Sequence, residues 1–153
     1  MEERDYPKGL DCVWIGSDRA GHVAAFVTGG EAPIPAYALK LNRTSIEAIE
    51  GELHVLPLTA GASLLVPLNR PDDFMELARR GFFAYDWTDA HRTLSEARYA
   101  YELIAAPEKP ILAEELPTEI AALLDGMSLN VVFTEDRAID VTKHLRCRTA
   151  SPY

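Results

Sequence analysis

The side chains of this sequence best suited to acid-base or nucleophilic chemistry near neutral pH are four histidines and two cysteines. The histidines lie at four separate places: His22, His54, His91 and His144. His22 follows Asp18 by four positions, across a short polar segment. A histidine beside a carboxylate can act as a general base whose ring the acid orients. Polar pairs at a turn more often belong to the local structure, which is the simpler interpretation here.

The cysteines differ in their surroundings. Cys147 lies between Arg146 and Arg148, whose charges should lower the pKa of its thiol, so it is the better candidate nucleophile. An exposed cysteine near the chain end is the plain alternative. Cys12 begins an apolar run that should raise its pKa. His144 and Cys147 could supply two zinc ligands, but a structural zinc site needs four, so we predict no metal.

Motifs for cofactor binding are missing from the sequence. Gly29-Gly30 is followed by neither lysine nor serine, and neither G-x-S-x-G nor H-E-x-x-H occurs. The adjacent acids Asp72-Asp73, Glu114-Glu115 and Glu135-Asp136 are predicted to complement helix dipoles or lie in solvated turns. The sequence therefore predicts no cofactor and favours a protein without catalytic activity.

Aromatic residues concentrate between positions 82 and 101, interleaved with acids. Rings that lose water on contact supply interface energy, while acids around them steer a basic partner. On this pattern we predict a partner-binding set made of Tyr85, Asp86, Trp87, Asp89, Tyr99, Tyr101 and Glu102. The alternative is that most of the rings fill the core.

A β-hairpin is predicted around the polar segment 18–21. Apolar runs at 13–16 and 23–27 flank it, and the closing Gly21 can take the positive φ of a tight turn. Both faces of these strands are apolar, which predicts cover on both sides, by helices on one and by further chain or a partner on the other.

Three short helices are expected. One should start at Thr44, as N-cap with Glu47 completing a capping box, and stop at Gly51. A second, over 71–80, has Pro71 in its first turn, acids behind it and arginines at its end. A third should run from 117 to 124.

The remaining apolar stretches are predicted as strands, with a polar turn at 88–91. They are edge strands at 54–58 and 62–67, strands at 81–87 and 98–105, and a second hairpin of 129–134 with 138–141. The chain should form a single α+β domain over 1–153, a mostly antiparallel sheet with about three short helices packed on one face. Residues 1–10 and 148–153 should be loose.

Charge narrows the range of partners. The net charge is −9 and the isoelectric point about 4.9, whereas nucleic acids and anionic membranes are bound by basic faces. No apolar run is long enough to cross a bilayer, and the first residues are acidic where a signal peptide would be basic, so we expect a soluble cytoplasmic protein. An acidic surface favours fast association with a basic protein.

Three segments carry a resemblance: V-W-I-G-S-D at 13–18, G-H-V-A-A-F at 21–26 and G-F-F-A-Y-D at 81–86. They resemble small bacterial proteins of unknown activity, encoded near toxins or on mobile elements, that are grouped as immunity-type proteins. The resemblance covers about a third of the chain and differs from the SUKH immunity pattern, which begins with a helix.

The resemblance and the acidity together lead to one functional hypothesis and two alternatives. The hypothesis is a non-catalytic acidic protein-binding domain, an immunity protein that neutralises a basic toxin. One alternative is a small hydrolase or transferase that uses His22 with Asp18, or Cys147. The other is a structural subunit that forms a homodimer through an exposed edge of the hairpin.

Overall fold

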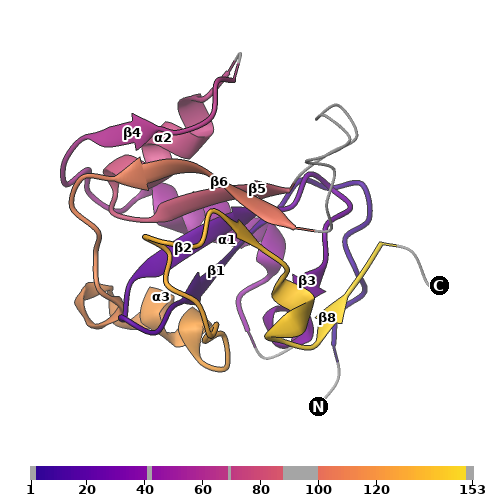
Figure 1. Ribbon diagram of the computed structural model, residues 1–153. Coiled ribbons are helices and arrows are strands. Elements are labelled where there is room, and N and C mark those ends of the chain that lie inside the picture. Colours follow the sequence, from indigo (N-terminus) through magenta and orange to yellow (C-terminus); the bar gives the residue numbers. More distant parts are fainter. Residues whose placement is uncertain (1–2, 41–42, 69, 88–99, 151–153) are drawn as a thin grey trace.

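The polar segment at 18–21 forms the turn of a β-hairpin, as predicted (Figure 1). The computed structural model describes residues 3–40, 43–68, 70–87 and 100–150. Strands β1 (Val13–Ser17) and β2 (Val23–Val27) pair antiparallel, and Gly21 in the turn has a φ of 86°. A residue with a side chain rarely adopts this φ, so glycine permits the tight reversal.

The hairpin is one end of a mixed sheet with the order β1-β2-β5-β6-β4. Its other strands are β4 (Ala62–Leu64), β5 (Phe83–Trp87), β6 (Tyr101–Pro107) and β7 (Ala138–Ile139). β2 and β5 are parallel and every other pair in this sheet is antiparallel. The single α+β domain with a mostly antiparallel sheet is therefore as predicted.

Two helices lie in the connection between the parallel strands. α1 (Ile46–His54) packs on β1, and α2 (Asp72–Arg79) packs on β5 and β6. α2 agrees closely with the helix predicted over 71–80. α1 begins after Ser45 instead of Thr44 and continues through Gly51. It continues because Leu53, two residues after Gly51, is fully buried, and this burial outweighs the weak helix propensity of glycine.

The third helix also forms near its predicted position. α3 (Thr118–Ala121) continues directly as the 3₁₀ helix η3 (Ala122–Leu124), which packs against β1. The described residues also contain three further 3₁₀ turns: η1 (Ala36–Leu39), η2 (Ala113–Glu115) and η4 (Val141–Lys143). None of the described helices is long and apolar enough to cross a membrane.

The opposite face of the sheet is covered by the C-terminal part of the chain. The Phe133 ring lies 5.6 Å from the ring of Tyr85 and 6.2 Å from that of Phe26. Nearby, β3 (Ile34–Pro35) and β8 (Cys147–Arg148) form a separate two-stranded sheet. The predicted cover on both faces of the hairpin is thus provided by this chain itself.

The chain ends, expected to be loose, are tied to each other where the structure describes them. The backbone N–H of Arg4 donates to the carbonyl of Leu39 at 2.6 Å. Glu3 forms ion pairs with Arg146 and Arg148, at N–O distances of 2.5 and 2.9 Å. Charge pairing therefore holds segments from the two ends side by side.

The strand predicted at 54–58 is wrong. His54 is the last residue of α1, and the chain leaves it as a loop. The Arg80 guanidinium donates to the carbonyls of His54 and Leu56, each at 2.9 Å, and so uses acceptors that a strand would need. The strand predicted at 62–67 forms only as the short β4.

The strand predicted at 129–134 is also wrong. Two carboxylates bind its backbone: Asp18 accepts from the N–H of Phe133 and Asp136 from that of Val132, each at 2.8 Å. These bonds curl the segment into a turn instead of a strand. β7 consequently pairs with β6, and the second hairpin does not form. The turn predicted at 88–91 lies outside the described residues.

Two glycines test this account of the backbone. Gly81 has a φ of 101°, and a Cβ there would lie 2.8 Å from the Cβ of Ile111. Gly51, inside α1, has nothing within 4 Å of an added Cβ. We expect Gly81→Ala to lower the free energy of unfolding by more than about 1 kcal/mol. Gly51→Ala should raise it by about 0.5–1 kcal/mol. Urea unfolding followed by circular dichroism measures both changes. Equal changes in the free energy of unfolding for the two variants would contradict the distinct backbone roles of Gly81 and Gly51.

Candidate functional site

Two rings of the predicted partner-binding set lie in the core. Tyr85 and Tyr101 are fully buried. The Tyr85 hydroxyl donates to the carbonyl of Asp136 at 2.6 Å, and the Tyr101 hydroxyl donates to that of Pro33 at 2.9 Å. Burial raises the pKa of both phenols well above the ordinary value. For these two residues the alternative interpretation, rings that fill the core, agrees with the structure.

The other described members of the set gather where β5 ends and β6 begins. Asp86 lies directly opposite Glu102, and Trp87 opposite Tyr101, with the Trp87 and Tyr101 ring centroids 5.3 Å apart. Asp86, Trp87 and Glu102 are half-buried. Asp89 and Tyr99 lie outside the described residues. The structure thus brings together two carboxylates and one partly exposed indole, and their role in binding a partner stays a prediction.

Asp18 and His22 are close in space but do not form the arrangement of a general base. One Asp18 oxygen accepts from the backbone N–H groups of Ala20 and His22, each at 2.9 Å. The other oxygen accepts from the N–H of Phe133 at 2.8 Å. The carboxylate therefore shapes the hairpin turn and joins it to the C-terminal segment, while Nδ1 of His22 is buried without a hydrogen-bond partner.

The role of Asp18 can be tested by Asp18→Asn. The amide would replace one acceptor oxygen with a donor that faces backbone N–H groups, at a site where the side chain is almost fully buried. We expect a loss of about 1–3 kcal/mol in the free energy of unfolding, measured by urea titration. Asp11→Asn is the matched control, because the exposed Asp11 accepts from one N–H only, that of Gly29. A loss no larger at Asp18 than at Asp11 would contradict the structural role.

The prediction of a reactive Cys147 does not agree with its surroundings. Burial raises the pKa of this thiol to about 12, and this effect exceeds the opposing one of the Arg146 charge. Sγ of Cys147 donates to the carbonyl of Leu145 at 3.4 Å. Burial also raises the pKa of Cys12, to about 11, in the direction that the sequence predicted. Both cysteines are free thiols in the structure.

Thiol labelling tests this result. At pH 8 a thiol with a pKa of about 12 holds roughly a thousandfold less thiolate than one with the ordinary value of 9.0. We expect native Cys147 and Cys12 to react with iodoacetamide at least about a hundredfold more slowly than after unfolding in urea. Mass spectrometry of the labelled peptides assigns the rates. Fast native labelling of Cys147 would restore it as a candidate nucleophile.

The described residues contain no group of three or more His, Cys, Asp or Glu side chains that could hold a metal ion. His54 instead lies 3.7 Å from the carboxylate of Glu50, one turn earlier on α1. His91 lies outside the described residues.

An open cleft of about 500 Å³ lies beside β7 and reaches Ala100, the residue that precedes β6. It is lined by Ala100, Asn130, Val131, Asp136, Ala138, Ile139, Asp140, Lys143 and His144. Its two acids already bind backbone: Asp136 accepts from Val132 and Asp140 from Thr142. The cleft therefore offers mixed charge, with Lys143 and His144 beside two acids that already accept hydrogen bonds from the backbone.

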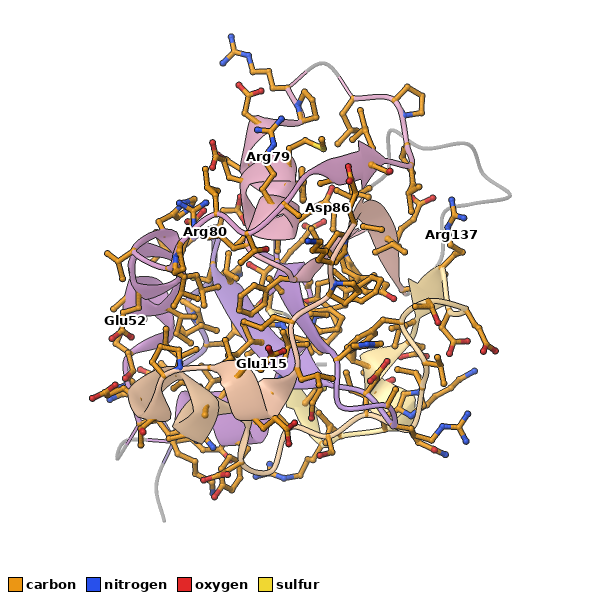
Figure 2. All side chains as sticks on the ribbon, turned by 90° about the vertical axis from the view of Figure 1, so that its left-hand side faces the viewer. Glu52, Arg79, Arg80, Asp86, Glu115 and Arg137 are labelled. Carbon is orange, nitrogen blue, oxygen red and sulfur yellow. The ribbon has the colours of Figure 1, made fainter. Side chains whose placement is uncertain are left out.

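A larger concentration of charge lies on the helical side of the molecule. Residues 44–53 contain three acids and no base, and residues 110–125 contain four acids and no base. We define the acidic surface as these seven carboxylates: Glu47, Glu50, Glu52, Glu114, Glu115, Glu119 and Asp125. Figure 2 labels two of them: Glu52 lies on α1, and Glu115 is the last residue of η2.

Arg43 joins the two elements of the acidic surface. Its guanidinium donates to the carbonyls of Leu123 and Asp125, at 2.9 and 2.5 Å, and so fixes the end of η3 beside the start of α1. Ile49 of α1 and Leu123 of η3 line the same small cavity against β1. Two acidic segments about seventy positions apart are thereby placed side by side.

The seven carboxylates form no ion pair with lysine or arginine among the described residues. Glu50 faces His54, Glu47 accepts from the Ser45 hydroxyl at 2.8 Å, and Glu115 accepts from the N–H of Leu112 at 2.8 Å. The hydrogen bond from Ser45 lowers the pKa of Glu47. The sequence alone predicts only that Glu114 and Glu115 complement a helix dipole or lie in a solvated turn.

Comparisons of this chain with protein-family models, with curated proteins and with solved structures find no match.

Proposed function

We propose that this protein is a non-catalytic binding domain that holds a basic protein partner on its acidic surface. The observation that carries the proposal is the set of seven carboxylates on α1 and residues 114–125, unpaired with lysine or arginine in the described chain. Like charges held together repel, and a partner that brings cations removes this repulsion on binding. Such complementarity raises the association rate and makes it sensitive to salt.

The partner we propose is a basic toxin domain, which the protein neutralises by stoichiometric binding. This step is supported by the resemblance of residues 13–18, 21–26 and 81–86 to immunity-type proteins and by the net charge of −9. A binding protein needs no nucleophile. The side chains of the two catalytic arrangements that we considered, His22 with Asp18 and Cys147, do not have the surroundings that catalysis would need. Asp18 binds three backbone N–H groups, and the pKa of the Cys147 thiol is raised.

The half-buried members of the predicted partner-binding set are a second part of the proposed contact. Asp86 and Glu102 supply negative charge. Trp87 supplies a partly exposed ring that packs edge-on against the ring of Tyr101. Aromatic anchors with charged neighbours are frequent among residues that dominate interface energy. In this proposal Tyr85 and Tyr101 support the anchor and do not touch the partner.

Exchange of charge on the acidic surface tests the proposal. We expect immobilised wild-type protein to capture a basic protein from a lysate of its source cells at low ionic strength, and to release it near 0.5 M salt, where screening is strong. Added in equal amount, the wild-type protein should abolish the toxicity of the captured protein. Glu114→Lys/Glu119→Lys should weaken the binding at least about tenfold by calorimetry.

The matched control is Asp5→Lys/Glu31→Lys, which makes the same change in net charge at exposed residues outside the acidic surface. It should bind nearly as the wild type does. Capture of no cationic protein at low salt would refute the proposed function. Equal weakening by both double variants would show that only net charge matters and would refute the assigned surface.

A further inference from the structure

β4 presents an open edge of the main sheet. The N–H of Leu65 donates to the carbonyl of Ile104 at 2.7 Å, and Ser63 pairs with Ala106 of β6. Because backbone groups alternate in direction along a strand, those of Leu64 point away from β6. In the described part of the chain no strand pairs with this side. Figure 1 shows β4 at the margin of the molecule, beside α2.

The opposite border of the sheet differs. β1, the edge that the sequence analysis considered for homodimer formation, is bound by the chain that follows η3. The N–H of Ser17 donates to the carbonyl of Met127 at 3.1 Å, and the N–H of Leu129 donates to the carbonyl of Ser17 at 2.8 Å. α1 also packs against β1. Among the described residues the unpaired edge is therefore β4, while the hairpin edge is bound by further chain at Ser17.

Exposed apolar side chains are frequent in β4 and in the segment that precedes it in the sequence. Five large hydrophobic side chains are exposed among the described residues, and three lie within residues 55–64. Val55 is 82% exposed, Leu58 57% and Leu64 39%. The first two belong to the loop that leads from α1 into β4. An exposed apolar residue on an unpaired strand, here Leu64, is typical of a site where another strand binds.

The segment is also uncharged. Residues 55–68 contain no acid and no base, although the whole chain carries −9. Charges on both sides cancel: residues 70–80 contain three acids and three arginines, and Glu108 is followed by Lys109. Exposed edge strands usually carry a lysine or another charge that prevents pairing. β4 lacks this protection, and its prolines, Pro57 and Pro67, lie outside the strand.

We propose that β4 pairs antiparallel with β4 of a second copy of this chain, about a twofold axis at Leu64. Two copies that each carry −9 repel through most of their surfaces, so contact costs least at a neutral segment. A twofold axis matches each edge to itself, as an isologous dimer requires. The inference is independent of the proposed function, because none of the seven carboxylates of the acidic surface lies in residues 55–68.

Sedimentation equilibrium of the purified protein tests the dimer. The wild type should have twice the monomer mass of 16.9 kDa at micromolar concentrations. Leu64→Lys, which places like charges opposite each other at the axis, should weaken dimerisation at least about tenfold. Leu10→Lys is the matched control, because Leu10 is 52% exposed and the variant carries the same added charge. It should dimerise as the wild type does.

Cross-linking gives a second measurement. Opposed residues of a hydrogen-bonded antiparallel pair have Cα atoms about 5.5 Å apart, within the range of a disulfide. Mild oxidation of Leu64→Cys should therefore give a covalent dimer linked at position 64, and Leu10→Cys should not. A monomeric wild type, or equal dissociation in Leu64→Lys and Leu10→Lys with unchanged circular dichroism, would overturn the inference. So would a wild-type dimer whose position 64 does not cross-link.

Discussion

The structure depends on a layer of aromatic rings that crosses the sheet. Trp14 and Phe26 stack at 4.1 Å, Phe26 and Tyr85 at 5.0 Å, and Tyr101 meets the first two edge-on. The indole of Trp14 donates to the hydroxyl of Tyr101, which donates in turn to the carbonyl of Pro33. Rings from four strands thus fill the core with their polar ends satisfied, and they fix the register between strands.

This construction explains why groups with catalytic potential serve the fold. The sheet is buried on both faces, so the turn of its hairpin must be joined to the segment that covers it. Asp18 does so by accepting hydrogen bonds from three backbone N–H groups, and Nδ1 of His22 has no hydrogen-bond partner. Cys147 is partly buried in the small second sheet. The contacts that we propose with partners therefore lie outside the core, on the acidic surface and along the edge of β4.

Sequence reasoning succeeded where one segment contains its own signal. The turn at Gly21, the helix over 71–80 with acids at its start and arginines at its end, and the mostly antiparallel sheet were predictable. It failed at 129–134, where an apolar stretch was predicted as a strand. The deciding bonds come from Asp18, more than a hundred positions earlier, and from Asp136. The sequence likewise could not show whether the rings of Tyr85 and Tyr101 face the core or the surface.

The sequence by itself determined the composition of this protein: the acidity, the apolar strands without a polar face and the local helix and turn signals. Tertiary structure decided which acids share a surface, because Arg43 binds the carbonyls at the end of η3 and brings that segment to α1. It also decided which strand edge is open in the described chain: the chain after η3 binds Ser17 of β1, and no described strand pairs with the outer side of β4. Both outcomes rest on backbone groups, which every residue carries, so side-chain patterns could not reveal them.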